Sequence, residues 1–152
     1  MKTNGEIKVR GCADGCPQHV NKTKEDTSSP TVAVESIFIT CAMAAKENRD
    51  VATVDIPGSF LQTDASDDMI IKLHGAVVEV LLRINPEWQQ YVMYEGPKKV
   101  PTIYSEALKA LYGTVDASKL FFEDLSRQLL DEMGFERNPY DWCVVNKIIN
   151  GK

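Results

Sequence analysis

The longest apolar stretch of the chain, residues 31–47 (TVAVESIFITCAMAAKE), constrains the possible fold most strongly. Its apolar residues fall on nearly every face of a helix, and Glu35 and Lys46 interrupt it well short of the ~20 residues that a membrane span needs. A helix that is apolar all round is normally buried. The stretch therefore predicts a helix buried on most faces, with Pro30, preceded by two serines, marking its start.

The rest of the chain alternates short strand-like and helix-like segments. Residues 51–56 (VATVDI) are β-branched and apolar, which is typical of a buried strand. Residues 11–30 are polar and predict a loop. Further strands are predicted at 7–10, 69–73, 100–104 and 143–149. Helices are predicted at 76–82, 85–94, 105–111 and 117–133, the last one capped by Asp116. This order predicts one α+β domain over residues 1–152, with a mostly antiparallel sheet packed on helices.

The last residues of the chain contain a strong turn signal. Asn150-Gly151 is typical of a two-residue hairpin turn, yet the sequence stops at Lys152. We therefore expect a fold that is cut before its next strand. The apolar strand at 143–149 would then lie near an exposed sheet edge, through which such chains self-associate.

Composition and charge exclude several classes of protein. The chain is 43% hydrophobic and 26% charged, as soluble globular domains are. Its net charge of −5 argues against a stand-alone nucleic-acid-binding protein, which usually has a basic face. The first eleven residues lack an apolar signal region. We expect a soluble intracellular protein, cytoplasmic or nuclear, with no membrane partner.

Cysteines and histidines offer one possible metal site. Cys12, Cys16 and His19 have a spacing that could bind zinc, but a structural site needs four ligands and no fourth lies nearby. Without a secretory signal, the four cysteines are expected as reduced thiols. We therefore expect ordinary loop residues, with a small zinc-binding domain as the weaker alternative.

Asp55 is the strongest single site candidate. It ends the predicted strand 51–56 just before Pro57-Gly58, where a carboxylate can hold a divalent cation at a sheet edge. The alternative is an aspartate that initiates a turn by bonding to its own backbone. Asp67 and Asp68 are expected in a solvated loop. These residues alone indicate no more than an α+β domain with one candidate acid.

Five segments, in their order, resemble the reverse transcriptase domain of copia-type retrotransposons. They are RGCADG (10–15), SSPTVAVESIFITCAM (28–43), VATVDIPGSFLQTD (51–64), LKALYG (108–113) and LLDEMGFERNPYDWCVVNK (129–147). The resemblance spans roughly residues 8 to 149. It implies a partial fingers and palm fold, with about 1–50 fingers-like and about 51–152 an incomplete palm.

The resemblance implies roles in an RNA-directed DNA polymerase, a nucleotidyltransferase that uses magnesium. Asp55 matches a catalytic, metal-binding aspartate, and Phe60 matches the aromatic gate that excludes a ribose 2′-hydroxyl. Arg10, and less closely Lys8, match basic residues over the triphosphate, and Gly113 matches a glycine beside the nucleotide. The implied partners are an RNA or DNA template-primer and deoxynucleotides. Without the resemblance, Phe60 would be a core aromatic and Gly113 a helix end.

The sequence also departs from the family. Residues 114–121 (TVDASKLF) replace the family's Leu-Lys-Gln-Ala-Pro-Arg-Ala-Trp, and its Tyr-Val-Asp-Asp hairpin does not occur. Asp55 alone cannot hold two magnesium ions, so we expect weak or absent magnesium and no activity from this chain in isolation. The alternative is a non-catalytic α+β interaction module derived from a transposable element. Under the polymerase hypothesis, Asp55, Phe60 and Gly113 line one cleft.

Overall fold

The computed structural model describes residues 5, 11–20, 22–66 and 69–149. The chain forms two compact units: Met1–Asp64 with Ala110–Lys152, called the first unit, and Ala65–Lys109, called the second unit. The predicted strand at 7–10, with Lys8 and Arg10, and the turn at 150–151 lie outside the described residues, as do Asp67 and Asp68. Among the residues described, no helix is long and apolar enough to cross a bilayer.

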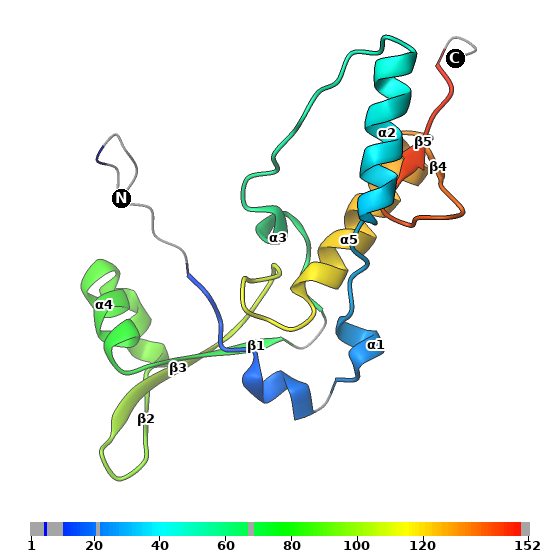
Figure 1. The fold of residues 1–152 in the computed structure, drawn as a ribbon. Helices are drawn as coiled ribbons and strands as arrows, with labels where there is room; N and C mark the ends of the chain where they lie inside the picture. Colours follow the sequence, from blue (N-terminus) through cyan, green and yellow to red (C-terminus); the bar gives the residue numbers. More distant parts are fainter. Residues whose placement is uncertain (1–4, 6–10, 21, 67–68, 150–152) are drawn as a thin grey trace. The chain divides into compact units, whose positions relative to one another are not determined.

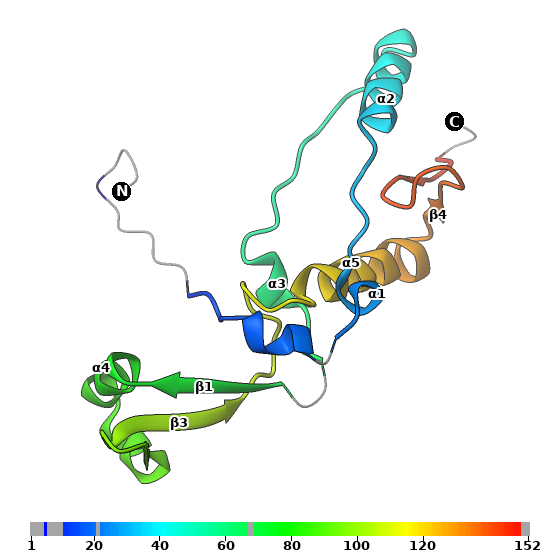
Figure 2. The ribbon, with the colours of Figure 1, turned by 60° about the horizontal axis from the view of Figure 1, so that its bottom comes forward.

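The second unit contains a three-stranded antiparallel sheet in the order β1-β3-β2 (Figure 1), and Figure 2 shows β1 and β3 side by side. Its strands are β1 (Ile70–His74), β2 (Met93–Glu95) and β3 (Val100–Glu106). The central strand β3 pairs Ile103 with Leu73 on one side and Thr102 with Met93 on the other. A tight turn at Gly96–Lys99 joins β2 to β3, with the Lys99 amide donating to the Gly96 carbonyl at 3.0 Å.

The core of the second unit lies between this sheet and helix α4 (Ala76–Ile84), which packs on β1 and β3. Val78 on α4 is 0% exposed and Ile103 on β3 is 1% exposed. Gly75 begins the helix, and its amide donates to the Pro101 carbonyl at 2.9 Å, which ties the helix start to the sheet. The strands predicted at 69–73 and 100–104 and the helix predicted at 76–82 are therefore confirmed, each slightly extended or shifted.

Two predictions in the second unit are wrong. The helix predicted at 85–94 is a short 3-10 helix, η2 (Pro86–Tyr91), capped by the Asn85 side chain, and β2 follows it. The helix predicted at 105–111 does not form, because β3 continues to Glu106 and pairs it with Ile70. In both cases pairing along β3 supplies backbone hydrogen bonds that the local pattern does not reveal.

The first unit is organised around α5 (Ala117–Arg127), which continues as the π-helix η3 (Gln128–Glu132). The short helices α1 (Lys24–Thr27) and α3 (Ser59–Gln62) pack on α5. The helix predicted at 117–133 is confirmed, and Gly134, with φ of 67°, ends it as the pattern indicates. The predicted loop at 11–30 contains α1, which a Thr23–Asp26 capping box nucleates, and the 3-10 helix η1 (Cys16–Val20).

Helix α2 (Val34–Lys46) confirms the helix predicted from the apolar stretch, but its predicted burial is wrong. None of its residues is buried, and Phe38 and Ile39 are 69% and 59% exposed. Local hydrogen bonding is enough to form a helix, whereas burial needs another element to cover it. In the part of the chain that is described, α2 lacks such cover.

The strand predicted at 51–56 is also wrong. These residues belong to no helix or strand in the structure, and Val54 is 87% exposed. An apolar β-branched segment becomes a strand only when a second strand satisfies its backbone groups. The strand predicted at 143–149 shrinks to β5 (Val145–Asn146), which pairs antiparallel with β4 (Glu136–Arg137) and leaves Ile148 and Ile149 exposed. The fold as a whole is α+β with small antiparallel sheets.

Candidate functional site

Asp55 does not occupy the position that the sequence predicts for it. The residue is exposed and lies in the irregular segment 51–56, so it does not end a strand. Over residues 5, 11–20, 22–66 and 69–149, no three His, Cys, Asp or Glu side chains gather closely enough to hold a metal ion. A single exposed carboxylate does not fit a pair of magnesium ions, each of which needs several oxygen ligands.

Phe60 lies in an aromatic cluster that it forms with Tyr112 and Phe121. Its ring centroid is 4.7 Å from that of Tyr112 and 6.1 Å from that of Phe121. Both centroid distances, and the tilted and edge-on angles between the rings, are those that aromatic pairs prefer. Phe60 reaches this position because α3 begins directly after Gly58, whose φ of 62° turns the chain into the helix. The cluster holds α3 against α5.

Gly113 lies where two backbone segments approach each other closely. Its φ is 94°, and a Cβ atom added to it would overlap the backbone carbonyl oxygen of Ala13. The same is true in reverse, because a Cβ on Gly15 would overlap the carbonyl oxygen of Gly113. The Ala13 amide donates to the Tyr112 carbonyl at 2.7 Å. Both glycines are therefore required by this contact, which no side chain could enter.

Three of the segments that carry the resemblance meet at Tyr112-Gly113. The segment 10–15 contacts it through Ala13, and the segment 51–64 contacts it through Phe60. The Ala110 amide also donates to the Thr63 carbonyl at 3.0 Å, which joins the segment 51–64 to the residues just before Tyr112. The structure thus brings Phe60 close to Gly113. The described contacts of this junction do not include Asp55, and Arg10 lies outside the described residues.

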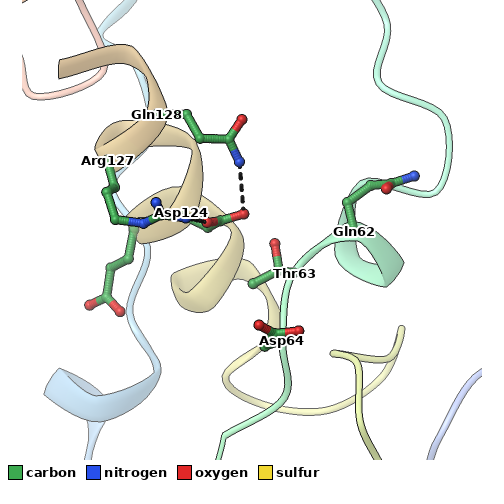
Figure 3. A pocket seen from close by; sticks show the side chains of 7 residues that line it. Gln62, Thr63, Asp64, Asp124, Arg127 and Gln128 are labelled. Carbon is green, nitrogen blue, oxygen red and sulfur yellow. Dashed lines mark hydrogen bonds and ion pairs between the residues drawn. The ribbon is translucent and has the colours of Figure 1, made fainter. Parts of the chain in front are cut away.

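A polar cavity of about 500 Å³ lies between the end of α3 and α5 (Figure 3). Its walls are Gln62, Thr63, Asp64, Glu123, Asp124, Arg127 and Gln128. The guanidinium of Arg127 pairs with Asp124 and, at 3.0 Å, with Glu132, and Gln128 donates to Asp124 at 3.1 Å. The carboxylate of Asp124 raises the pKa of Arg127.

The charges of this cavity decide what it can bind. Three carboxylates line it against one guanidinium, and that guanidinium already has two acidic partners. The cavity therefore disfavours an anion such as a nucleoside triphosphate. The cavity was not predicted from the sequence. The spacing of Asp124, Arg127 and Gln128, three and four residues apart along a helix, is nevertheless a local signal for their ion pair and hydrogen bond.

Asp116 has a different role from the predicted one. It occupies the residue before α5, as expected of a cap, but its side chain makes no capping hydrogen bond there. Asp116 is 3% exposed, and its carboxylate pairs instead with the ammonium of Lys22. This partly buried pair ties the segment between η1 and α1 to the start of α5. No local pattern indicates this pair, because Lys22 and Asp116 are 94 positions apart in the sequence.

The predicted zinc alternative requires Cys16, which has another partner here. The thiol of Cys16 bonds the carboxylate of Asp14, whose hydrogen bond and negative charge raise the pKa of the thiol. The Cys16 amide also donates to Asp14 at 3.0 Å. Zinc binds the thiolate, so a raised thiol pKa opposes metal binding at this position. Cys12 and Cys16 are both exposed free thiols.

Comparison of the chain with protein-family models, with curated proteins and with solved structures gave no match. Function must therefore be argued from the order of the motifs and from the contacts described above.

Proposed function

We propose that the chain is a fragment of a copia-type reverse transcriptase domain, comprising the fingers and the first half of the palm. The observation that carries this proposal is the junction at Tyr112-Gly113, where the segments 10–15, 51–64 and 108–113 meet. The family would bring the positions of Phe60 and Gly113 to one nucleotide, and here the Phe60 ring contacts Tyr112, the residue directly before Gly113. Such a meeting of separate motifs supports descent from this fold.

The chain by itself is not expected to polymerise. Two-metal phosphoryl transfer needs two cations about 4 Å apart, each held by several oxygen atoms. Of the expected ligands only Asp55 is present, and it is exposed and away from any acidic cluster within the described ranges. Purified with magnesium, template-primer and deoxynucleotides, the chain should leave the primer unextended.

A chimera tests the proposal directly. The chain would be joined after Lys152 to the hairpin and thumb region of an active copia-type enzyme, and primer extension would be measured with magnesium. We expect extension that Asp55→Asn abolishes. Asp50→Asn, which removes an equal charge from an exposed aspartate five residues earlier, is the matched control and should leave extension intact. Phe60→Val should admit ribonucleotides that the parent chimera rejects.

Two results would overturn the proposal. A folded chimera that does not extend primers, or one in which Asp55→Asn and Asp50→Asn behave alike, would show that these residues do not carry the family's roles. Extension by the 152-residue chain alone, lost on Asp55→Asn, would refute the expected inactivity.

The second candidate is a non-catalytic α+β interaction module derived from a transposable element. The exposed apolar residues of α2 and of the chain after β5 favour it, since exposed apolar surface marks interaction sites. We expect self-association through residues 143–149 under this hypothesis and under the first. Sedimentation velocity of the parent and of Ile148→Lys with Ile149→Lys measures it. A monodisperse monomer at high concentration would contradict a self-associating edge.

A further inference from the structure

A second pocket lies on the first unit, between α5 and the β4–β5 hairpin, and has a different chemistry. It has a volume of about 390 Å³ and is called the Arg137 pocket here. Phe122 and Trp142 supply aromatic surface, and Lys119, Arg127 and Arg137 supply positive charge against the single carboxylate of Glu123. Although the whole chain carries a charge of −5, this pocket is locally positive.

The guanidinium of Arg137 is the group in this pocket best placed to bind an anion. It lies over the ring of Trp142 at 5.2 Å and over the ring of Phe122 at 5.6 Å from the centroids. Among the ion pairs of the described residues, none involves Arg137. An arginine held against aromatic faces keeps its N–H donors directed outward in the plane of the guanidinium. Those donors match a carboxylate or a phosphate.

The other two cations are already partly neutralised. Arg127 pairs with Asp124 and Glu132, and Lys119 donates to the Glu25 carbonyl at 3.1 Å and lies 4.0 Å from Glu123. Arg137 therefore carries the positive charge that is least compensated. Its position is set by β4, where the backbone of Arg137 pairs with Val145. A fixed backbone and two ring contacts hold the side chain ready for a ligand, which lowers the entropy cost of binding.

The indole of Trp142 adds an exposed aromatic face on which a planar ring of a ligand can stack. Its side chain is 63% exposed even though one neighbour, Arg137, lies against the indole. An exposed indole next to an unpaired guanidinium is the combination that binds a nucleobase by stacking and its phosphate by charge. A neutral apolar ligand would leave the guanidinium unused. An aliphatic anion would leave the indole unused.

We propose that the Arg137 pocket binds one nucleotide unit of a single-stranded nucleic acid, with the phosphate at Arg137 and the base against Trp142. The exposure of Trp142 favours a strand over a free nucleotide, because a pocket for a small molecule buries most of its ligand. A unit within a strand needs no such enclosure, since its neighbours continue across the surface. The proposal does not rest on the polymerase assignment, because it uses none of the residues assigned there.

The two tryptophans allow a direct measurement. Trp88→Phe leaves Trp142 as the only tryptophan, and Trp142→Phe leaves only Trp88, which lies on η2 in the second unit. A single-stranded oligonucleotide of about 12 nucleotides, within the usual site size of such proteins, is titrated into each variant. Stacking should quench the emission of Trp142 in the first variant. The emission of Trp88 in the second should not change.

Affinity variants identify the charged partner. Arg137→Gln and Trp142→Ala should each weaken binding of the oligonucleotide at least about fivefold, the lower end expected for loss of one stacked base or its phosphate contact. Arg137→Gln should also lower the slope of log affinity against log salt by about 0.7, the value for one phosphate of a single strand. Arg83→Gln, an equal charge change at an exposed arginine of α4, should alter neither quantity.

Competitors and folding controls make each outcome decisive. Adenosine monophosphate and inorganic phosphate should compete only weakly, and equal competition by either would overturn the strand proposal in favour of a small-anion site. Preferential competition by polyglutamate would overturn it in favour of an acidic peptide. Unchanged binding by Arg137→Gln would overturn it as well. If that variant fails to melt cooperatively by circular dichroism, Arg137→Met, which removes the charge but keeps a long side chain against the two rings, takes its place in the same comparison.

Discussion

The second unit and the region of α2 with residues 51–56 are both rich in apolar residues, yet they differ in burial. In the second unit, Val78 and Ile103 are almost completely shielded between α4 and the sheet. On α2, the large apolar side chains remain exposed, and residues 51–56 form no strand. The difference is the presence of a partner: β1 and β2 pair with both edges of β3, and α4 covers the sheet.

An apolar pattern along the sequence shows that burial would be favourable, which is different from showing that burial occurs. The pattern shows that a segment gains free energy when it is covered, at about 25 cal/mol for each Å² of apolar surface removed from water. It does not show that a covering element exists. Residues 51–56 have the composition of a central strand, and the exposed positions of Val51 and Val54 show what becomes of such a segment without pairing.

The largest effect should come from truncating the same residue type in the two regions. Ile103→Ala should lower the free energy of unfolding of the second unit by about 2–5 kcal/mol, because it leaves a cavity in a packed core. Ile39→Ala on α2 should change stability by no more than about 0.5 kcal/mol, since it removes an exposed side chain. Urea denaturation, followed by Trp88 fluorescence for the first variant and by circular dichroism for both, measures the difference. Equal losses would show that α2 is covered in solution.

A smaller effect is expected at the junction of the first unit. Gly113→Ala should cost about 2–4 kcal/mol, because alanine is strained at φ of 94° and its Cβ would overlap the Ala13 carbonyl oxygen. Gly96→Ala in the second unit has a similar φ of 68° but meets no atom within 4 Å, so it should cost only about 1 kcal/mol. Thermal unfolding of the two variants checks this. Equal shifts would show that the segments 10–15 and 108–113 are not in contact.

The smallest effect concerns the link between α2 and the β4–β5 hairpin. The pKa of Asp141 is lowered from 3.8 by hydrogen bonds from the Ser36 side chain and from the Ala33 and Cys143 amides. The stabilisation is therefore complete above the ordinary aspartate pKa and is lost as pH falls through the lowered value. Asp141→Asn should speed hydrogen exchange of the amides of α2 at neutral pH.

The exposed Asp131→Asn is the matched control for this link, because it removes the same charge from η3 without touching α2. Its exchange rates over residues 34–46 should equal those of the parent. If Asp141→Asn also left these rates unchanged, the contact between Asp141 and the start of α2 would not hold the helix.

Much of the fold follows from local chemistry that the sequence displays. The four-residue recurrence of Phe121, Leu125 and Leu129 predicts α5, and Gly134 predicts its end. Asn85 caps η2 as its sequence indicates. Strand β2 was missed because it is three residues long and exists only through its pairing with β3.

In the candidate site, too, some features were predicted from the sequence and others were not. The resemblance indicated that Phe60 and Gly113 lie near each other, and in the structure Phe60 contacts Tyr112, the residue before Gly113. No pattern predicted the contact of Phe60 with Phe121. The strand-end position of Asp55 was wrong because it depended on a strand that needed a partner. The Arg137 contacts with Phe122 and Trp142 were not predicted either, since nothing in the spacing of these residues indicates that their rings meet.

The sequence by itself determined where the longer helices α2, α4 and α5 form, because capping, helical periodicity and the backbone freedom of glycine act over a few neighbouring residues. Only the tertiary structure decided which apolar segments are buried and which side chains meet, because these depend on elements that are distant along the chain. Lys22 and Asp116 illustrate the limit. Each looks like an ordinary surface or capping residue in the sequence, and their partly buried ion pair exists only because the chain returns to the start of α5.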